Sequence, residues 1–270
     1  AEGDSYYSAN DLTDDSWKFT IAQKEITPQI TAENKDYDGN SEATVSVTFD
    51  GLVAGETLEK DVDYTIDSAT FDNANAGENK TVTVIFTSLN NTPKANNYTL
   101  SSDQATTAAN IDKKSITPQI TAENKDYDGT TDATISVSFG GLQNNEELTE
   151  GTDYNVSATF ADENAGENKT VTAKISLTES AKAKNYQLSS DSATATATAN
   201  IDKKSITVTA DTQKKIEGEV DPELTYTVDG LIEGDKLTGN LVREEGEKPG
   251  TYDIKLGTLE NPNYKITFIS

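Results

Sequence analysis

Acidic residues form the clearest chemical pattern in this sequence. Two stretches carry oxygen-bearing side chains at every second position, first Asp36, Asp38, Asn40 and Glu42, and then Asp126, Asp128, Thr130 and Asp132. A calcium-binding loop supplies oxygen ligands from its first, third and fifth positions, so either stretch could bind Ca²⁺. The bidentate Glu that such a loop needs at its twelfth position is replaced by Val47 and Val137. The alternative is an Asp-Gly turn whose carboxylates accept hydrogen bonds from backbone amides.

The composition excludes several kinds of catalysis. The 270 residues include no His, no Cys and no Met, and the one arginine is Arg243. Catalysis by Ser-His-Asp or Cys-His groups, disulfide bonds, and metal sites built on imidazole or thiolate are therefore excluded. Among 47 acidic residues, some carboxylate pairs will have the spacing for glycoside hydrolysis, and a solvated acidic surface explains them equally well. We expect no enzymatic activity, no catalytic residue and no cofactor apart from the calcium considered above.

The charge excludes two classes of partner. The formal net charge is −25, whereas binding to nucleic acid or to anionic lipid requires clustered Lys and Arg. No apolar run approaches the roughly 20 residues of a membrane-spanning helix. We expect no nucleic-acid partner and no membrane insertion within this segment.

The chain repeats itself. The sequence ITPQITAENKDYDG occupies 26–39 and recurs at 116–129, an offset of 90 residues, and a related start, ITVTADTQKKIEG, follows at 206. The same hexapeptide, NIDKKS, precedes the second and third starts. We therefore predict an N-terminal segment and three domains, with boundaries 1–24, 25–114, 115–204 and 205–270.

Both chain ends look cut in this comparison. Trp17 to Ile21 stand where the closing strand of a preceding repeat would stand, with Ile21 in the register of Ile111 and Ile201. The third unit stops soon after Tyr264, so we expect it to lack its final strand. The chain is interpreted as an excerpt from a longer array.

Apolar residues alternate with Thr, Ser and charged residues, as in half-buried strands. Examples of this alternation are Val45/Val47/Phe49, Val82/Val84/Phe86, Leu224/Tyr226/Val228 and Tyr252/Ile254/Leu256. No segment of helical length keeps a 3.6-residue apolar period. The pattern predicts an all-β chain of three tandem immunoglobulin-like β-sandwich domains. Because IDKKSIT leads from one domain into the next without a Gly/Ser or Pro-rich spacer, we expect an elongated, rod-like array.

An Asn-Tyr pair recurs in a late strand of every unit, with Tyr98, Tyr186 and Tyr264 as its tyrosines. Such a tyrosine could bond back to upstream backbone, as in the tyrosine corner of immunoglobulin-like sandwiches. An ordinary half-buried strand tyrosine is the equal alternative. Near the start, Tyr6, Tyr7 and Trp17 could instead form an exposed aromatic cluster for a sugar or a protein.

These motifs resemble those of known domains. The stretches KDYDG at 35–39 and 125–129 resemble YDG-type repeats of bacterial surface proteins. The third unit, with DPELTY at 221–226, GTY at 250–252 and Asn263-Tyr264, resembles the MBG-type domains that accompany them, although Ile216-Glu217-Gly218 replaces the usual Tyr-Gly. The resemblance implies a secreted or wall-anchored, extracellular bacterial protein of the adhesin type, without enzyme activity or a fixed ligand.

Two functions follow from this resemblance and from the duplication. The first is a structural stalk or spacer of a large cell-surface adhesin, monomeric, whose partners are neighbouring repeats of the same chain. Near-identical copies favour it, because spacers multiply by duplication. The alternative is a ligand-binding module that recognises a glycan or a host protein. In that case we expect the site in the divergent third unit.

Overall fold

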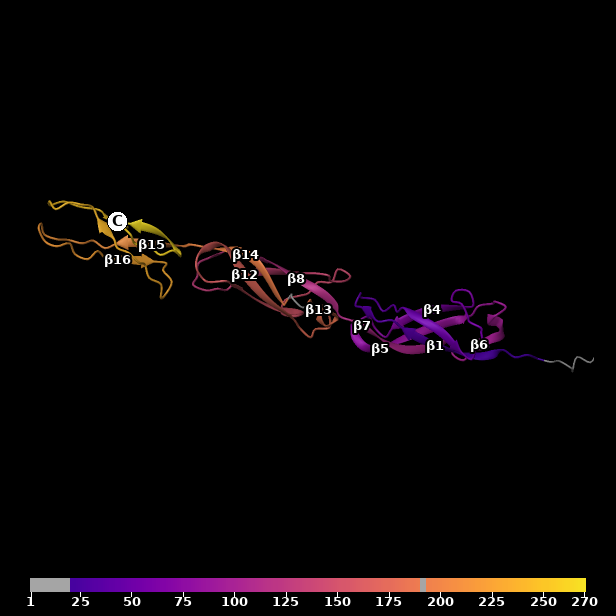
Figure 1. The fold of residues 1–270 in the computed structure, drawn as a ribbon. Helices are drawn as coiled ribbons and strands as arrows, with labels where there is room; N and C mark the ends of the chain where they lie inside the picture. Colours follow the sequence, from indigo (N-terminus) through magenta and orange to yellow (C-terminus); the bar gives the residue numbers. More distant parts are fainter. Residues whose placement is uncertain (1–19, 190–192) are drawn as a thin grey trace, which may run out of the picture. The chain divides into compact units, whose positions relative to one another are not determined.

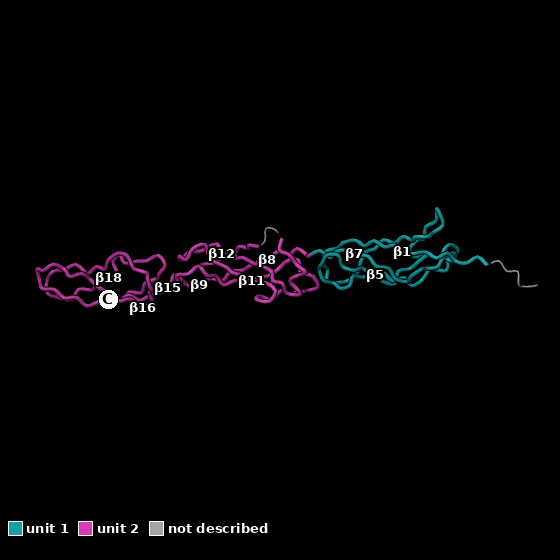
Figure 2. Tube along the Cα trace, turned by 90° about the horizontal axis from the view of Figure 1, so that it is seen from below, with its two compact units in different colours: residues 1–112 teal, residues 113–270 magenta. Residues whose placement is uncertain are grey.

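The computed structural model describes residues 20–189 and 193–270, and they form an all-β protein (Figure 1). The chain divides into two compact units, Ala1–Asp112 and Lys113–Ser270 (Figure 2). The first unit holds the first repeat, and the second unit holds the second repeat together with the third domain. Three β-rich domains therefore follow one another, as predicted.

The first repeat folds into two sheets. Its strands are β1 (Lys24–Ala32), β2 (Lys35–Asp36), β3 (Val45–Asp50), β4 (Tyr64–Phe71), β5 (Gly77–Leu89), β6 (Tyr98–Leu100) and β7 (Gln104–Asp112). One sheet has the order β3-β1-β6 and the other the order β2-β7-β5-β4. Strand β1 pairs antiparallel with β3 and parallel with β6, so it is the central strand of its sheet, between an early and a late strand of the repeat.

The second repeat has the same design. Its strands are β8 (Lys114–Ala122), β9 (Lys125–Asp126), β10 (Ile135–Gly140), β11 (Tyr154–Phe160), β12 (Gly166–Leu177), β13 (Tyr186–Leu188) and β14 (Thr194–Asp202). The sheet orders are β10-β8-β13 and β11-β12-β14-β9, matching the first repeat strand for strand. A 3₁₀ turn precedes the tyrosine strand in each repeat, at Ala95–Asn97 and Ala183–Asn185.

The core of each repeat lies between its two sheets. In the first repeat Tyr64, Val84 and Phe86 of one sheet are buried against Val47 and Phe49 of the other. The rings of Phe49 and Tyr64 meet edge to face with centroids 5.0 Å apart. Since the alternating apolar residues of both sheets face each other, the predicted sandwich is confirmed.

The third domain contains shorter strands. They are β15 (Lys204–Ala210), β16 (Tyr226–Asp229), β17 (Val242–Arg243), β18 (Ile254–Lys255) and β19 (Tyr264–Ile269). The sheet orders are β16-β15-β19 and β17-β18, and β15 pairs parallel with β19 over six residues. Val208, Leu241 and Leu259 are buried between them.

Two strands of the third domain are shorter than the alternation predicts. Leu224 lies before β16, and the pattern Tyr252/Ile254/Leu256 gives a ladder only at Ile254–Lys255. The strand pairing of β18 does not extend to Tyr252, whose side chain contacts Lys248 and Arg243 instead. The Tyr252 hydroxyl donates to the carbonyl oxygen of Lys248 at 2.8 Å, and the Arg243 guanidinium lies 5.6 Å from its ring centroid.

The predicted closing strand and aromatic cluster near the N-terminus lie mostly outside the described residues. The predicted closing strand around Trp17, and the aromatic cluster with Tyr6 and Tyr7, fall in residues 1–19, outside the described part of the chain. Residues 20–23 belong to no strand, and the side chain of Ile21 is exposed. By contrast, Ile111 and Ile201 are buried in β7 and β14.

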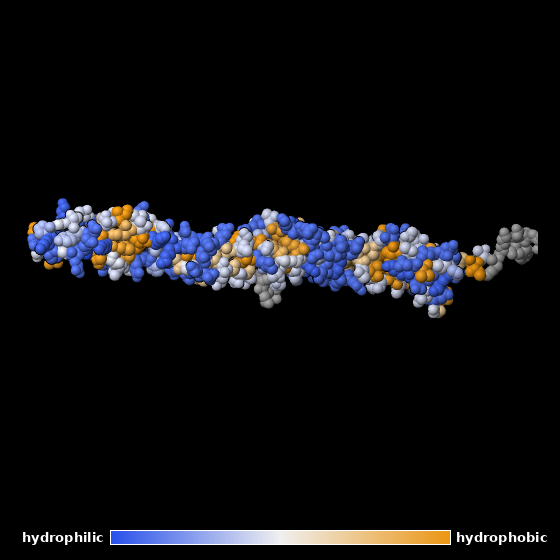
Figure 3. All heavy atoms as spheres, turned by 90° about the horizontal axis from the view of Figure 1, so that it is seen from above, coloured by the Kyte–Doolittle hydropathy of each residue, from blue (hydrophilic) through white to orange (hydrophobic). Residues whose placement is uncertain are grey.

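The surface is largely polar. Hydrophilic residues cover much of the face shown in Figure 3, and hydrophobic residues form separate patches on it. No helix among the described residues is long and apolar enough to cross a membrane.

Candidate functional site

A lysine ammonium group lies among the oxygens of each predicted calcium loop. In the first repeat, Lys35 Nζ is 2.8 Å from Asp38 Oδ1 and 2.9 Å from Asn40 Oδ1, and it also donates to the carbonyl oxygens of Asn40 and Glu42. In the second repeat, Lys125 Nζ is 2.7 Å from Asp128 Oδ1 and 2.9 Å from the Thr130 carbonyl oxygen. Several of the oxygens that calcium would need are therefore hydrogen-bonded to an ammonium of the same loop.

The carboxylates also accept bonds from backbone amides of the turn, as the alternative interpretation predicted. Asp38 Oδ1 accepts from Asn40 N–H at 3.0 Å, and Asp128 Oδ1 from Thr130 N–H at 2.9 Å. Desolvation would raise the pKa of Asp38 and Asp128, but the bonds to lysine and backbone amides outweigh it and lower both pKa values.

The backbones of the other acidic candidates take part in strand pairing. Asp36 and Asp126 lie in β2 and β9, while Glu42 and Asp132 form isolated bridges to Thr70 and Thr159. Across residues 20–189 and 193–270, no three His, Cys, Asp or Glu side chains are grouped to hold a metal ion. The contacts with lysine and backbone amides favour the hydrogen-bonded turn, and a direct test of calcium binding decides between the two interpretations.

The hydroxyl of the recurring tyrosine binds both a backbone amide and a carboxylate of an upstream loop, an arrangement that we call a tyrosine lock. The Tyr98 hydroxyl accepts a bond from Val53 N–H at 3.1 Å and donates to Glu56 Oε2 at 2.5 Å. Tyr186 does the same with Gln143 N–H and Glu146. This is the back-bonding to upstream backbone that the tyrosine-corner interpretation predicted. Burial of Tyr186, together with the Glu146 carboxylate, raises its pKa to about 12.

A buried aspartate closes a second turn in each repeat. Asp153 Oδ2 accepts from Thr149 N–H at 2.9 Å, and its Oδ1 accepts from the Ser180 hydroxyl at 2.7 Å. In the first repeat, the Asp63 carboxylate accepts the equivalent hydrogen bonds from Glu59 N–H and the Thr92 hydroxyl. The bond from Ser180 is the main reason that the pKa of Asp153 is lowered.

The second repeat and the third domain meet in a packed joint inside the second compact unit. Strand β14 ends at Asp202 and β15 begins at Lys204, so a single residue connects them. One cluster of buried residues includes side chains of both domains, among them Tyr127 and Ile201 from the repeat and Ile206 and Tyr264 from the third domain. The rings of Tyr127 and Tyr264 meet edge to face at 5.4 Å.

Polar contacts cross this joint at two places. The Tyr127 hydroxyl donates to Asp235 Oδ2 at 3.1 Å. The Asn263 side chain accepts from Ala165 N–H at 2.9 Å and donates to Asn164 Oδ1 at 3.2 Å. The YDG tyrosine of the second repeat is thus a residue of the joint. Burial is the main cause of its raised pKa, and the Asp235 carboxylate adds to the effect.

The turn after Tyr127 also approaches the third domain. Gly129 has φ of +76°, which favours glycine, and a Cβ built on it would lie 3.7 Å from Ile232 Cγ2. The glycine of the YDG motif therefore lets the chain turn back where the two domains pack.

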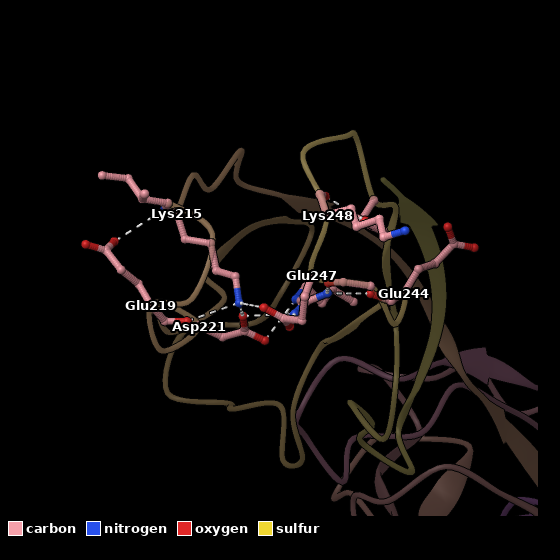
Figure 4. A network of polar contacts seen from close by, with 10 residues as sticks. Lys215, Glu219, Asp221, Glu244, Glu247 and Lys248 are labelled. Atoms are coloured by element: carbon pink, nitrogen blue, oxygen red, sulfur yellow. Dashed lines mark hydrogen bonds and ion pairs between the residues drawn. The ribbon is translucent and has the colours of Figure 1, made fainter.

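The third domain has a surface cleft of about 790 Å³, and four of the charged residues that line it bind one another. Arg243 binds Asp221 through two hydrogen bonds, at 2.8 and 3.0 Å, and Glu247 at 2.8 Å. Lys215 Nζ lies 2.7 Å from Asp221 and 2.8 Å from Glu247, so two cations and two anions form one network (Figure 4). Hydrogen bonds from Arg243 and Lys215 lower the pKa of Asp221 to about 2.

Sequence reasoning located the motifs but not these contacts. Tyr127 and Asp235 are 108 positions apart, and neither the role of Asp235 nor that of Asn263 was predicted. The signal was present as the Gly-Leu-x-x-x-Asp/Glu stretch and the Asn-Tyr pair, which recur in related form in all three units.

The comparisons with known proteins match this architecture. The model of the YDG domain matches residues 22–108 and 112–197, and the model of the MBG domain (YGX type) matches residues 206–270. No curated protein and no solved structure matches the chain. Neither domain type is known as enzymatic. With most of its length matched in this way, the chain belongs to the YDG domain family, as two YDG domains followed by an MBG domain, and is a repeat region of a bacterial surface protein.

Proposed function

We propose that this chain is a stalk or spacer segment of a large bacterial cell-surface adhesin, which holds a binding domain away from the cell. It would act outside the cell, at the cell surface or cell wall, as a monomer and without catalytic activity. The single observation that carries the proposal is the joint between the second repeat and the third domain. One connecting residue and a shared apolar core leave these two domains little freedom to bend.

Duplication supports the same function. The two YDG domains share their strand order, their lysine-filled acidic turns, their tyrosine locks and their buried aspartates. These shared features satisfy polar groups within the domain, which is what a spacer requires.

The second candidate function is binding of a glycan or a host protein by the third domain. The observation that favours it is the cleft beside Arg243 and Tyr252, because aromatic and arginine side chains commonly anchor ligands. Against it, two cations of the cleft, Lys215 and Arg243, are already paired with Asp221 and Glu247.

Two measurements on the whole chain test the proposal. Small-angle scattering should give an elongated particle, and a collapsed particle would contradict a spacer. An array of glycans and host proteins probed with the chain should give no specific binding. Binding that Arg243→Ala abolishes would replace the spacer with the binding module.

A further inference from the structure

The carboxylate of Asp235 is bonded by tyrosine hydroxyls from two domains. Tyr264 of its own domain donates to Asp235 Oδ2 at 2.5 Å, and Tyr127 of the preceding repeat donates to the same oxygen at 3.1 Å. Tyr264 also accepts from Ile232 N–H at 3.2 Å, which completes the same lock that Tyr98 forms in the first repeat. Asp235 therefore has two roles, an internal lock and a contact across the joint.

The surroundings make the contact across the joint selective. Tyr127 and Tyr264 are each 4% exposed, so their hydroxyl groups must find partners within the protein. An ionised carboxylate accepts several hydrogen bonds and donates none, so one Asp can serve both tyrosines. A neighbouring domain without an acid at this position would deprive the buried Tyr127 hydroxyl of its carboxylate acceptor, which is costly.

A second attachment fixes the rotation of the joint. Asn263 binds Asn164 and Ala165, which lie in the loop between β11 and β12, whereas Tyr127 follows β9. Asn263 is 8% exposed. Two polar attachments from separate loops, with the apolar contact between them, define one orientation rather than a pivot.

The geometry points to Tyr127 and Asp235 as a recognition pair, through which a YDG domain selects and orients the domain that follows it. The partner that fits is a β-domain with an apolar residue at the place of Ile232, an acid at the place of Asp235 and an Asn-Tyr pair at 263–264. This inference depends on the proposed spacer function for its biological purpose, but the pair itself can be tested separately.

The Ala165 amide proton reports whether the joint is closed, because its acceptor belongs to the other domain. Its hydrogen exchange should be measured by NMR in the full chain, alongside Gly151 N–H, which bonds to Tyr154 within the second repeat. Tyr127→Phe keeps the ring and removes the hydroxyl that crosses the joint. Since a hydrogen bond to a charged group is lost, we expect Ala165 to exchange roughly tenfold faster or more, with Gly151 unchanged.

Asp235→Ala should accelerate Ala165 exchange at least as much as Tyr127→Phe. The matched control is Glu56→Ala, which removes the same internal lock from Tyr98 in the first repeat and should leave Ala165 unchanged. If Asp235→Ala accelerates exchange and Tyr127→Phe does not, Asp235 acts through Tyr264 alone and the recognition pair is refuted. Unchanged exchange in both variants refutes it as well.

Residual dipolar couplings then show what the pair does to orientation. One alignment frame should describe the second repeat and the third domain of the native chain, and two frames should be needed for Tyr127→Phe. A single frame in the variant would overturn the role in orientation. These outcomes are distinct from those of the ligand array, since a glycan-binding chain with a closed joint would overturn only the spacer function.

Discussion

Single polar side chains close the turns of both YDG domains. Asp153 satisfies a backbone amide and a hydroxyl from two different loops, and Lys125 satisfies several oxygens of one loop. Among the described residues, no buried side-chain nitrogen or oxygen lacks a partner. Because leaving such a group unpaired costs more than the bond itself contributes, these few residues have a large effect on stability.

Asp153→Ala should destabilise the second repeat by about 1–3 kcal/mol, since it leaves Thr149 N–H and the Ser180 hydroxyl without their acceptor. Urea unfolding followed through amide signals of the second repeat measures the change. Asp126→Ala, at an exposed residue, is the control and should stay within about 0.5 kcal/mol. Equal effects of both variants would contradict the role given to Asp153.

Calcium and a chelator should leave the melting temperature unchanged, because the ammonium of Lys35 or Lys125 lies among the candidate ligand oxygens. Calorimetry with and without calcium measures this. A site with a Kd of about 1 mM would add about 1.4 kcal/mol at 10 mM calcium, which is easily seen. A melting temperature that rises with calcium concentration would establish the calcium site instead.

At the scale of elements, loops are held by side chains where strands are short. The tyrosine locks tie a late strand to an upstream loop in all three domains. In the third domain, the Arg243 network ties β17 to the loop between β15 and β16 and to the loop that follows β17.

The tyrosine locks predict a loss of stability at high pH. The folded-state pKa values of Tyr186 and Tyr264 are raised to about 12, from an ordinary value near 10. Unfolding therefore releases protons once the pH exceeds about 10. The stability that these hydroxyls contribute is complete below that pH and is lost as the pH rises towards 12. Unfolding followed by circular dichroism across this range, with tyrosinate absorbance, tests the sign, and constant stability would contradict it.

Arg243→Ala should make the loops of the third domain open more readily, because a two-bond pair with Asp221 and a bond to Glu247 are lost. Proteolysis around residues 244–250 should become faster. Lys255→Ala, which breaks an exposed pair with Glu244, is the matched control and should have little effect. Equal proteolysis rates in the two variants would show that the network does not hold these loops.

For the whole molecule, the decisive features are charge and the joint. The net charge of −25 is spread along the chain, and each domain is acidic. Like charges favour solubility and separation of neighbouring molecules. The joint between the second repeat and the third domain is held by buried contacts, which salt screens little.

The orientation of the second repeat relative to the third domain should therefore not depend on ionic strength. Residual dipolar couplings recorded at low salt and near 1 M salt should fit the same relative frame for these two domains. A change in frame would show that surface charge, rather than the packed joint, sets the orientation.

Sequence alone determined the all-β class, the duplication, the YDG and MBG domain types and many of the strands, since alternation and repeated motifs are local properties of the chain. Only the tertiary structure showed that a lysine lies in each acidic turn, that the tyrosine locks bind both a backbone amide and a carboxylate, and that Tyr127, Asp235 and Asn263 meet in a joint. For the joint, the physical reason is distance along the chain. Residues 98 to 108 positions apart come together only when two finished sandwiches pack, and no local pattern encodes that contact.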